Sequence, residues 1–156
     1  MRIVAWIRED GWESVVDAVA AQDPSEITLL HVLAPVHPGP GLLGRHAKPG
    51  RYQEIAGAAA EALLADAETR LLALREEAAG ARAGAGTAER AAAGPAPRLH
   101  RLAVPGRAED IVIGACEHAD LLVMARSGLH PGPHSLEHET RFVVDHAPCT
   151  VLLTWP

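Results

Sequence analysis

A segment rich in glycine and histidine, SGLHPGPHSLEHE at residues 127–139, has the residue types of a ligand-binding loop. It follows a short apolar run that ends at Met124 and Ala125, and it precedes a segment with the pattern of a helix. A glycine loop in such a place can bring backbone amides close to phosphate oxygens, and the start of the next helix attracts negative charge. The segment is therefore a candidate phosphate-binding loop.

The same segment carries His130, His134 and His138 at intervals of four. That spacing aligns metal ligands only on a continuous helix, and the Pro-Gly-Pro sequence at 131–133 interrupts one. We therefore expect no metal site. The chain also lacks the HExxH, GxxxxGK[ST] and GxSxG motifs, so we do not expect an enzyme.

The bulk composition indicates one globular domain over residues 1–156. A net charge of -6, from 14 basic and 20 acidic residues, offers no cationic face for nucleic acid or for an anionic membrane. The first apolar run, residues 3–7, meets charged residues too early for a signal peptide, and a cytoplasmic protein is expected. Cys116 and Cys149 lack metal or redox spacing, and we interpret them as small buried hydrophobic residues.

Apolar patterning divides the chain into alternating strands and helices. Strands are expected at 2–7, 26–32, 98–104, 120–125 and 149–155, and helices at 12–21, 52–77, 108–119 and 136–146. With right-handed crossovers, this alternation predicts an α/β fold with an open, doubly wound, five-stranded parallel sheet and helices on both faces. Residues 35–50 are expected to form a surface loop, and the alanine- and glycine-rich residues 78–97 a mobile loop.

Four segments resemble the universal stress protein family: RIVAWI, ITLLHVLAP, ADLLVMARSG and RFVVDHAPCTVLL. The resemblance implies the strand order 3-2-1-4-5, homodimers that meet through the last strand and, in one branch of the family, ATP between the first and fourth strands. An open parallel sheet of this order reverses its winding direction at that point, which is where ligands bind. The apolar TVLLTW segment agrees with a dimer, because an uncovered sheet edge of that kind favours pairing.

The ATP-binding members carry Gly, two residues, Gly, nine residues, and then Gly followed by Ser or Thr. Here Ala125 stands at the first glycine and Gly128 matches the second. Eight residues then intervene instead of nine, and Glu137-His138 stands where Gly-Ser is expected. Glu137 and Glu139 would lie in the first turn of the last helix. A carboxylate at about 5 Å from a phosphate costs about 3 kcal/mol at an effective dielectric near 20. Weakened phosphate recognition is therefore expected.

The remaining candidates flank this loop or end the first two strands. Asp10 could accept hydrogen bonds from ribose or adenine, or it could cap the first helix, and Arg8 competes with it for that position. Val32 could offer its backbone to adenine, while Ser135 could bind a shifted phosphate or cap the last helix. The nucleotide site is predicted to comprise Asp10, Val32, Met124, Ala125, Arg126, Gly128, Gly132, Ser135 and His138.

The sequence therefore predicts a non-catalytic universal stress-type protein that acts in stress response or regulation by ligand-dependent binding. ATP is left open as its ligand. The alternative is a ligand-free dimeric interaction scaffold that does not bind ATP, in which side chains such as Trp6, Arg126 and His138 fill the crevice.

Overall fold

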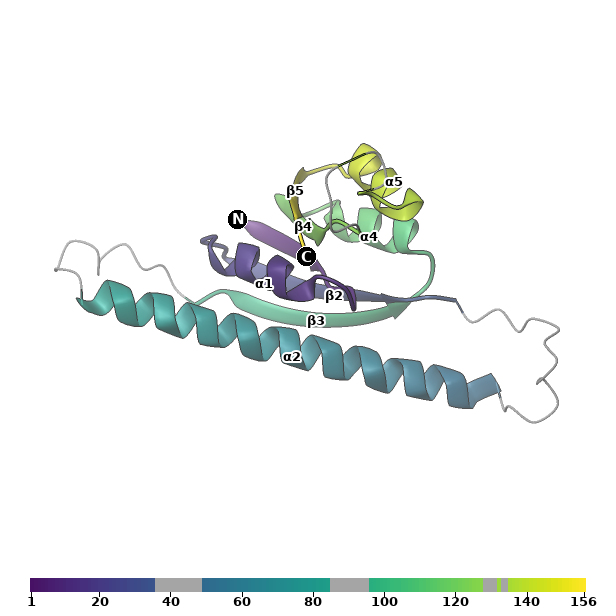
Figure 1. Ribbon diagram of the computed structural model, residues 1–156, viewed down its shortest axis with the longest axis horizontal. Coiled ribbons are helices and arrows are strands. Elements are labelled where there is room, and N and C mark those ends of the chain that lie inside the picture. The colour runs from purple at the N-terminus through teal and green to yellow at the C-terminus, as the bar shows by residue number, and fades with distance from the viewer. Residues whose placement is uncertain (36–48, 85–95, 128–131, 133–134) are drawn as a thin grey trace.

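The computed structural model describes residues 1–35, 49–84, 96–127, 132 and 135–156. Its elements are β1 (Arg2–Trp6), α1 (Trp12–Ala20), β2 (Glu26–Leu33), α2 (Pro49–Gly84), β3 (Arg98–Pro105), α4 (Ala108–Cys116), β4 (Leu121–Ala125), α5 (His138–His146) and β5 (Thr150–Thr154). The strands form one parallel sheet in the order β3-β2-β1-β4-β5 (Figure 1). The predicted fold class and strand order are confirmed.

The central strand β1 is buried on both faces of the sheet. Ile3 and Ala5 pack into a core shared with α1 and α2, while Val4 and Trp6 face a second core shared with α4 and α5. Successive side chains of a strand point to opposite faces, so a strand covered on both sides needs apolar residues at every position. This explains the continuous apolar run at residues 3–7.

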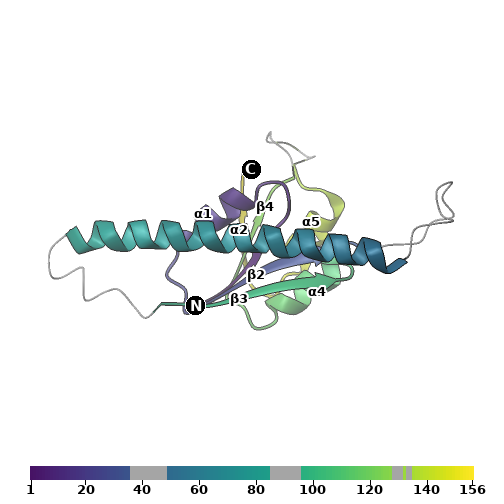
Figure 2. The same ribbon diagram turned by 90° about the horizontal axis from the view of Figure 1, so that it is seen from below.

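The long helix α2 has 36 residues and extends past the sheet at both ends (Figures 1 and 2). Its buried residues, Ala60, Leu64, Ala67 and Leu71, recur at intervals of three and four, and the last three pack into the core. The predicted bounds of 52–77 were too short, since α2 continues through residues 78–84, where alanine and arginine favour a helix. None of the helices in the described ranges combines the length and apolarity that a membrane span requires.

Both predicted loops lie largely outside the described residues, which omit 36–48 and 85–95. Of the first loop, residues 49 and 50 belong to α2, and of the second, residues 78–84 do. The mobility expected for the rest of 78–97 stays a prediction.

The last helix begins later than predicted. The N-cap of α5 is Glu137, without a side-chain capping bond, so the prediction that Ser135 caps this helix is wrong. Val143 is fully buried, whereas Phe142 is 38% exposed and stacks on His146, with ring centroids 4.0 Å apart. Adjacent helix positions differ by about 100° in direction, and on α5 only Val143 of these two is buried in the core.

A tight turn at Gly11 connects β1 to α1. Gly11 has φ 78° and is the N-cap of α1, so the prediction that Asp10 caps this helix is wrong. A Cβ atom at Gly11 would lie 2.8 Å from the Cβ of Ala125 and 2.9 Å from the Cβ of Pro156. Glycine is required here both by the left-handed backbone and by the close approach of β4 and the C-terminus.

Candidate functional site

The sheet reverses its winding direction between β1 and β4, which lie side by side at its centre. Chain segments after β1 and β4 leave the sheet at the same edge, because the strands are parallel. Arg8 follows β1 and Arg126 follows β4, so two guanidinium groups flank the switch point. The turn at Gly11 directs the chain after Arg8 over this edge.

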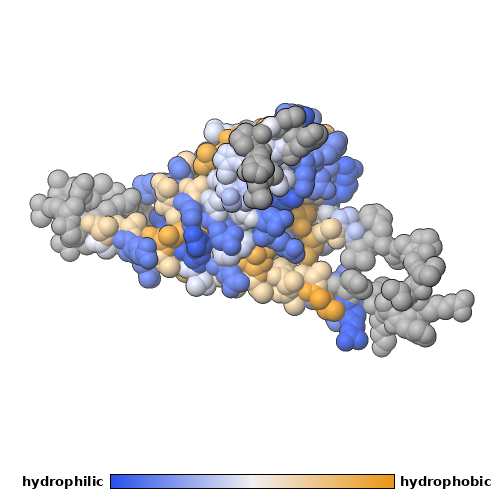
Figure 3. All heavy atoms as spheres, viewed as in Figure 1, coloured by the Kyte–Doolittle hydropathy of each residue, from blue (hydrophilic) through white to orange (hydrophobic). Residues whose placement is uncertain are grey.

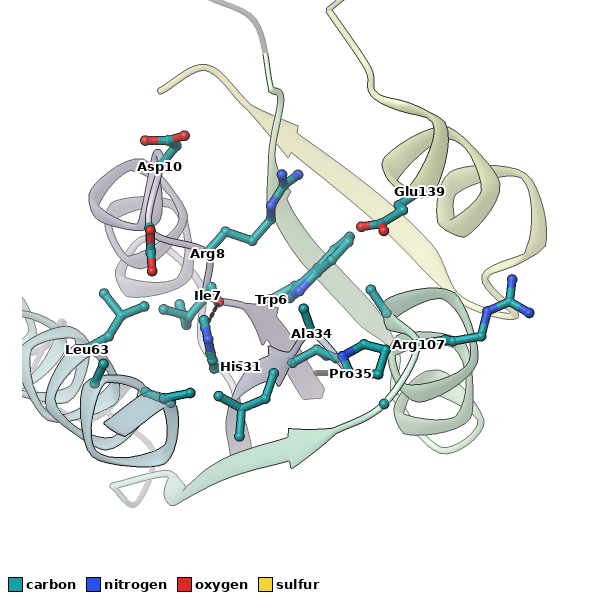
Figure 4. Close-up of a pocket in the computed structure, with 18 of the residues that line it drawn as sticks. Trp6, Ile7, Arg8, Asp10, His31, Ala34, Pro35, Leu63, Arg107 and Glu139 are labelled. Atoms are coloured by element: carbon teal, nitrogen blue, oxygen red, sulfur yellow. Dashed lines mark hydrogen bonds between the residues drawn. The ribbon is translucent and has the colours of Figure 1, made fainter. Parts of the chain in front are cut away.

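A cleft of about 840 Å³ opens at this edge, over the ends of β1, β2 and β3 (Figure 4). Trp6, which is 3% exposed, and Val32 contribute to its lining. The overhanging N-terminal half of α2 adds an apolar wall from Ala56 to Leu63, and Figure 3 shows apolar colour along this part of the helix. The other lining residues are Ile7, Arg8, Glu9, Asp10, His31, Leu33, Ala34, Pro35, Gly106, Arg107, Ala108, Glu109 and Glu139.

Arg8 closes the β4 side of this cleft. Its Nη2 lies 2.8 Å from Oε2 of Glu137, and its Nη1 donates to Oγ1 of Thr140 at 3.1 Å and to Oγ of Ser127 at 3.4 Å. The guanidinium also lies over the Trp6 ring, with Cζ 5.4 Å from the ring centroid. One arginine thus ties β1 to the segment after β4 and to the start of α5.

Arg126 is committed to a different set of contacts on the other side of the switch point. Its Nη1 donates to Oγ of Ser135 at 2.8 Å, and its Cζ lies 4.8 Å from the ring centroid of Trp155. The Ser127 amide also donates to the Ser135 carbonyl at 3.1 Å. Ser135 is 5% exposed, so its hydroxyl serves the loop itself and is not offered to a ligand in this arrangement.

The predicted site residues fall into two groups. Asp10 and Val32 line the cleft. Met124 and Ala125 are buried in β4, and neither they nor Arg126 and Ser135 contribute to the cleft lining. His138 is the exposed first residue of α5, Gly132 is exposed, and Gly128 lies outside the described residues.

Arg8 and Asp10 are both candidates for the position after the first strand that could contact a ribose or adenine, and they differ in direction. Both line the cleft, but Arg8 turns toward β4 and α5, whereas Asp10 is exposed beside α1 (Figure 4). His31 is half-buried, and its Nδ1 lies 2.8 Å from the Ile7 carbonyl oxygen. A carbonyl only accepts, so Nδ1 carries the proton and Nε2 is an acceptor when the ring is neutral.

The charges at the cleft are mostly carboxylates. Arg107 Nη2 lies 3.7 Å from Oε1 of Glu109, which is 8% exposed as a residue. On the opposite side, Glu139 extends from α5 toward the Trp6 ring (Figure 4). No ion pair joins Glu139, Glu9 or Asp10 to another of the described side chains. The cleft therefore carries a negative field with few unengaged cations.

Several lining residues were not singled out by sequence reasoning. Arg107 comes from the turn after β3, Glu109 from the first turn of α4, and the Ala56–Leu63 wall from α2. The apolar residues that recur with helical spacing in 52–77 include Ala59 and Leu63, and this pattern indicates a helix packed on a core, not the wall of a cleft. The place of this wall at the cleft depends on how α2 lies relative to the ends of the strands, and local sequence patterning does not reveal that.

The two cysteines lie away from the cleft. Cys116 is fully buried in the core beneath α4, with the half-buried Cys149 packed against the same cluster, and both are free thiols. Burial, and secondarily the neighbouring Cys149, raises the pKa of the Cys116 thiol to about 12. The interpretation of Cys116 as a buried core residue is confirmed. His130 and His134 lie outside the described residues, so the expected absence of a metal stays a prediction.

The sequence model of the universal stress protein family matches residues 13–154. No curated protein matches the sequence. Among solved structures, a universal stress protein in complex with cAMP is similar at 16% identity and a TM-score of 0.60, covering 99% of this chain and 96% of that one.

Two further structures are similar along nearly their whole length. A universal stress protein family member from Burkholderia pseudomallei has 16% identity and a TM-score of 0.59, with 98% of this chain and 94% of that chain covered. A family member from Arabidopsis thaliana with AMP bound has 14% identity and a TM-score of 0.54, with 99% and 91% covered. At these identities the structures support the fold alone, whereas the family match spans most of the sequence. The chain belongs to the universal stress protein family.

Proposed function

We propose that this protein is a non-catalytic member of the family that acts in stress response or regulation by binding a nucleotide-type ligand with weakened phosphate recognition. The cleft at the switch point is large enough for a base and a sugar, with an apolar lining and a few polar groups. Structures of similar fold contain cAMP or AMP, which supports a ligand of this class.

The ion pair between Arg8 and Glu137 carries the proposal. Glu137 stands where the ATP-binding members have glycine, and its carboxylate already occupies the Arg8 guanidinium at 2.8 Å. A phosphate tail directed toward α5 would have to displace this carboxylate and then lie beside it. Glu137 and Glu139 lie at the N-terminus of α5, so their carboxylates already offset the positive end of the helix dipole that would otherwise attract a phosphate.

Thermal unfolding with adenosine, AMP and magnesium-ATP in turn tests the proposal. A ligand at 100 times its dissociation constant adds about 2.7 kcal/mol to the free energy of unfolding, which raises Tm by about 5–10 °C for a chain of this size. A rise with at least one of them is expected. Unchanged Tm values at millimolar concentrations of all three would contradict the proposal.

The second candidate is the ligand-free dimeric scaffold. It is favoured by the protein side chains that occupy the space at the switch point. Trp6 is nearly inaccessible, and Arg8 spans the space between β1 and α5. Of the side chains expected to fill the crevice, Trp6 lines the cleft, but Arg126 and His138 do not. This candidate predicts unchanged unfolding curves with every nucleotide and a partner-binding surface elsewhere.

A homodimer through β5 is part of both candidates. β5 is at one edge of the sheet, and its residues from Val151 to Thr154 are only half-buried in the single chain. Trp155, which follows it, is 41% exposed. Pairing would cover this edge. Sedimentation at micromolar concentration should give a dimer, and a monomer would remove this part of the proposal.

A further inference from the structure

The charge of the cleft indicates which ligands of the proposed class it accepts. Its lining includes four acidic residues and two arginines. Both arginines are already paired, since Arg8 lies 2.8 Å from Glu137 and Arg107 lies 3.7 Å from Glu109. A ligand therefore meets no cation in the cleft that lacks a carboxylate partner within the described structure.

The acids that remain are distributed on opposite sides. Glu9 and Asp10 follow β1 beside α1, and Glu139 approaches the Trp6 ring from α5 (Figure 4). None of the three has an ion-pair partner among the described residues. A phosphate placed toward either side consequently approaches a carboxylate, and the repulsion is stronger in a cleft than on open surface because less water intervenes.

The uncharged features suit a base and a sugar. Val32 and Leu63, beside the nearly buried Trp6, provide apolar surface for a flat ring. His31 is oriented by its Nδ1 contact with the Ile7 carbonyl, so that Nε2 is the ring nitrogen left for a ligand. Carboxylates such as Asp10 accept hydrogen bonds from ribose hydroxyls without needing a positive partner.

We propose that this cleft selects uncharged nucleosides over nucleoside phosphates. The inference rests on the nucleotide-type cleft proposed above and names the ligand class that this cleft prefers. Each added phosphate charge weakens binding, because the groups that would neutralise it are engaged by the protein's own carboxylates.

Calorimetric titration of the full chain with adenosine, AMP, ADP and ATP, without magnesium, tests the inference as a charge series. The dissociation constant is expected to rise along the series, with ATP at least about tenfold weaker than adenosine at low salt. The difference should shrink at about 0.5 M salt, where exposed charges are screened over a few ångströms.

A pair of matched substitutions locates the effect. Glu139→Gln removes a carboxylate that faces Trp6 in the cleft, and Glu117→Gln removes an exposed carboxylate at the end of α4 that does not line it. Glu139→Gln should narrow the ratio of the ATP and adenosine dissociation constants several-fold. Glu117→Gln should leave the ratio as it is in the wild type.

Three results would overturn the inference, and they differ in what they imply for the proposed cleft. ATP that binds as tightly as adenosine, or more tightly, means that Glu137 releases Arg8 to the phosphates, and the proposed nucleotide cleft still stands. If no member of the series binds, the proposed function fails together with the inference. An equal narrowing by both glutamine variants would show that overall charge, and not the cleft, sets the preference.

Discussion

The guanidinium of Arg8 and the carboxylate of Glu137 lie 2.8 Å apart and join the end of β1 to the start of α5 across the switch point of the sheet. The two residues are 129 positions apart in the chain. The contact gives Glu137 a second role, because the sequence alone indicates only a charge that repels phosphate. It is also the partner of the arginine that a phosphate would need.

Replacing Glu137 and His138 by the family's Gly-Ser pair should strengthen ATP binding. The double variant Glu137→Gly, His138→Ser frees Arg8 and removes one carboxylate from the first turn of α5. Because the Glu137 side chain is 56% exposed, we expect solvent to reduce the gain to about tenfold. Calorimetry with magnesium-ATP measures it.

The chain contains a matched control for this variant. Glu117-His118 is the same dipeptide in exposed positions after α4, outside the cleft. Glu117→Gly with His118→Ser makes the identical change in composition and charge, and ATP affinity should not change. If the control variant gained as much ATP affinity as the variant at 137 and 138, the gain could not be assigned to the start of α5.

The Arg8–Glu137 pair should add little to the free energy of unfolding. The two side chains are 26% and 56% exposed, so a double-mutant cycle with Arg8→Met and Glu137→Gln should give a coupling of about 0.2–1 kcal/mol. Methionine keeps an unbranched apolar chain beside Trp6. Urea unfolding at low and high salt checks this, and the coupling should fall as salt rises. A coupling of several kcal/mol that is insensitive to salt would identify a buried structural pair instead.

Substituting Gly11 should destabilise the protein. Gly11→Ala places a Cβ 2.8 Å from the Ala125 Cβ at a backbone φ of 78°, and the expected loss is about 2–4 kcal/mol of the free energy of unfolding. Gly57→Ala is the control, since Gly57 lies within α2 and has no atom within 4 Å of an added Cβ. Alanine at position 57 should raise the free energy of unfolding by about 0.5–1 kcal/mol. Equal effects of the two substitutions in urea unfolding would refute this account of the turn.

Stability should fall in alkali partly because of Cys116. Burial raises the pKa of this thiol from 9.0 to about 12, so below pH 9 it is neutral in both the folded and the unfolded chain. Between these values the unfolded thiol loses its proton first, and the free energy of unfolding decreases by up to about 1.4 kcal/mol per pH unit. Cys116→Ala should flatten this slope in urea unfolding from pH 8 to 11. Identical slopes in the two proteins would exclude a contribution from Cys116.

The strands were predictable from sequence because β1 and β4 are buried on both faces. Apart from Arg2 at the start of β1, their residues are apolar at every position, and such runs are visible without knowledge of the fold. The family resemblance then supplied the strand order, and with it the location of the switch point. The length of α2 was harder to predict, because its alanine-rich ends favour a helix while presenting no apolar stripe that marks where the helix stops.

The contacts at the candidate site were decided by the tertiary structure. Residue types and the missing Gly-Ser pair were readable in the sequence, and they predicted weak phosphate recognition. That Arg8 pairs with Glu137, that Arg126 holds Ser135, and that α2 walls the cleft all depend on segments brought together by the sheet. Local patterning reports which face of an element is buried, whereas the partner of a polar side chain depends on the distance and direction between elements far apart in the chain.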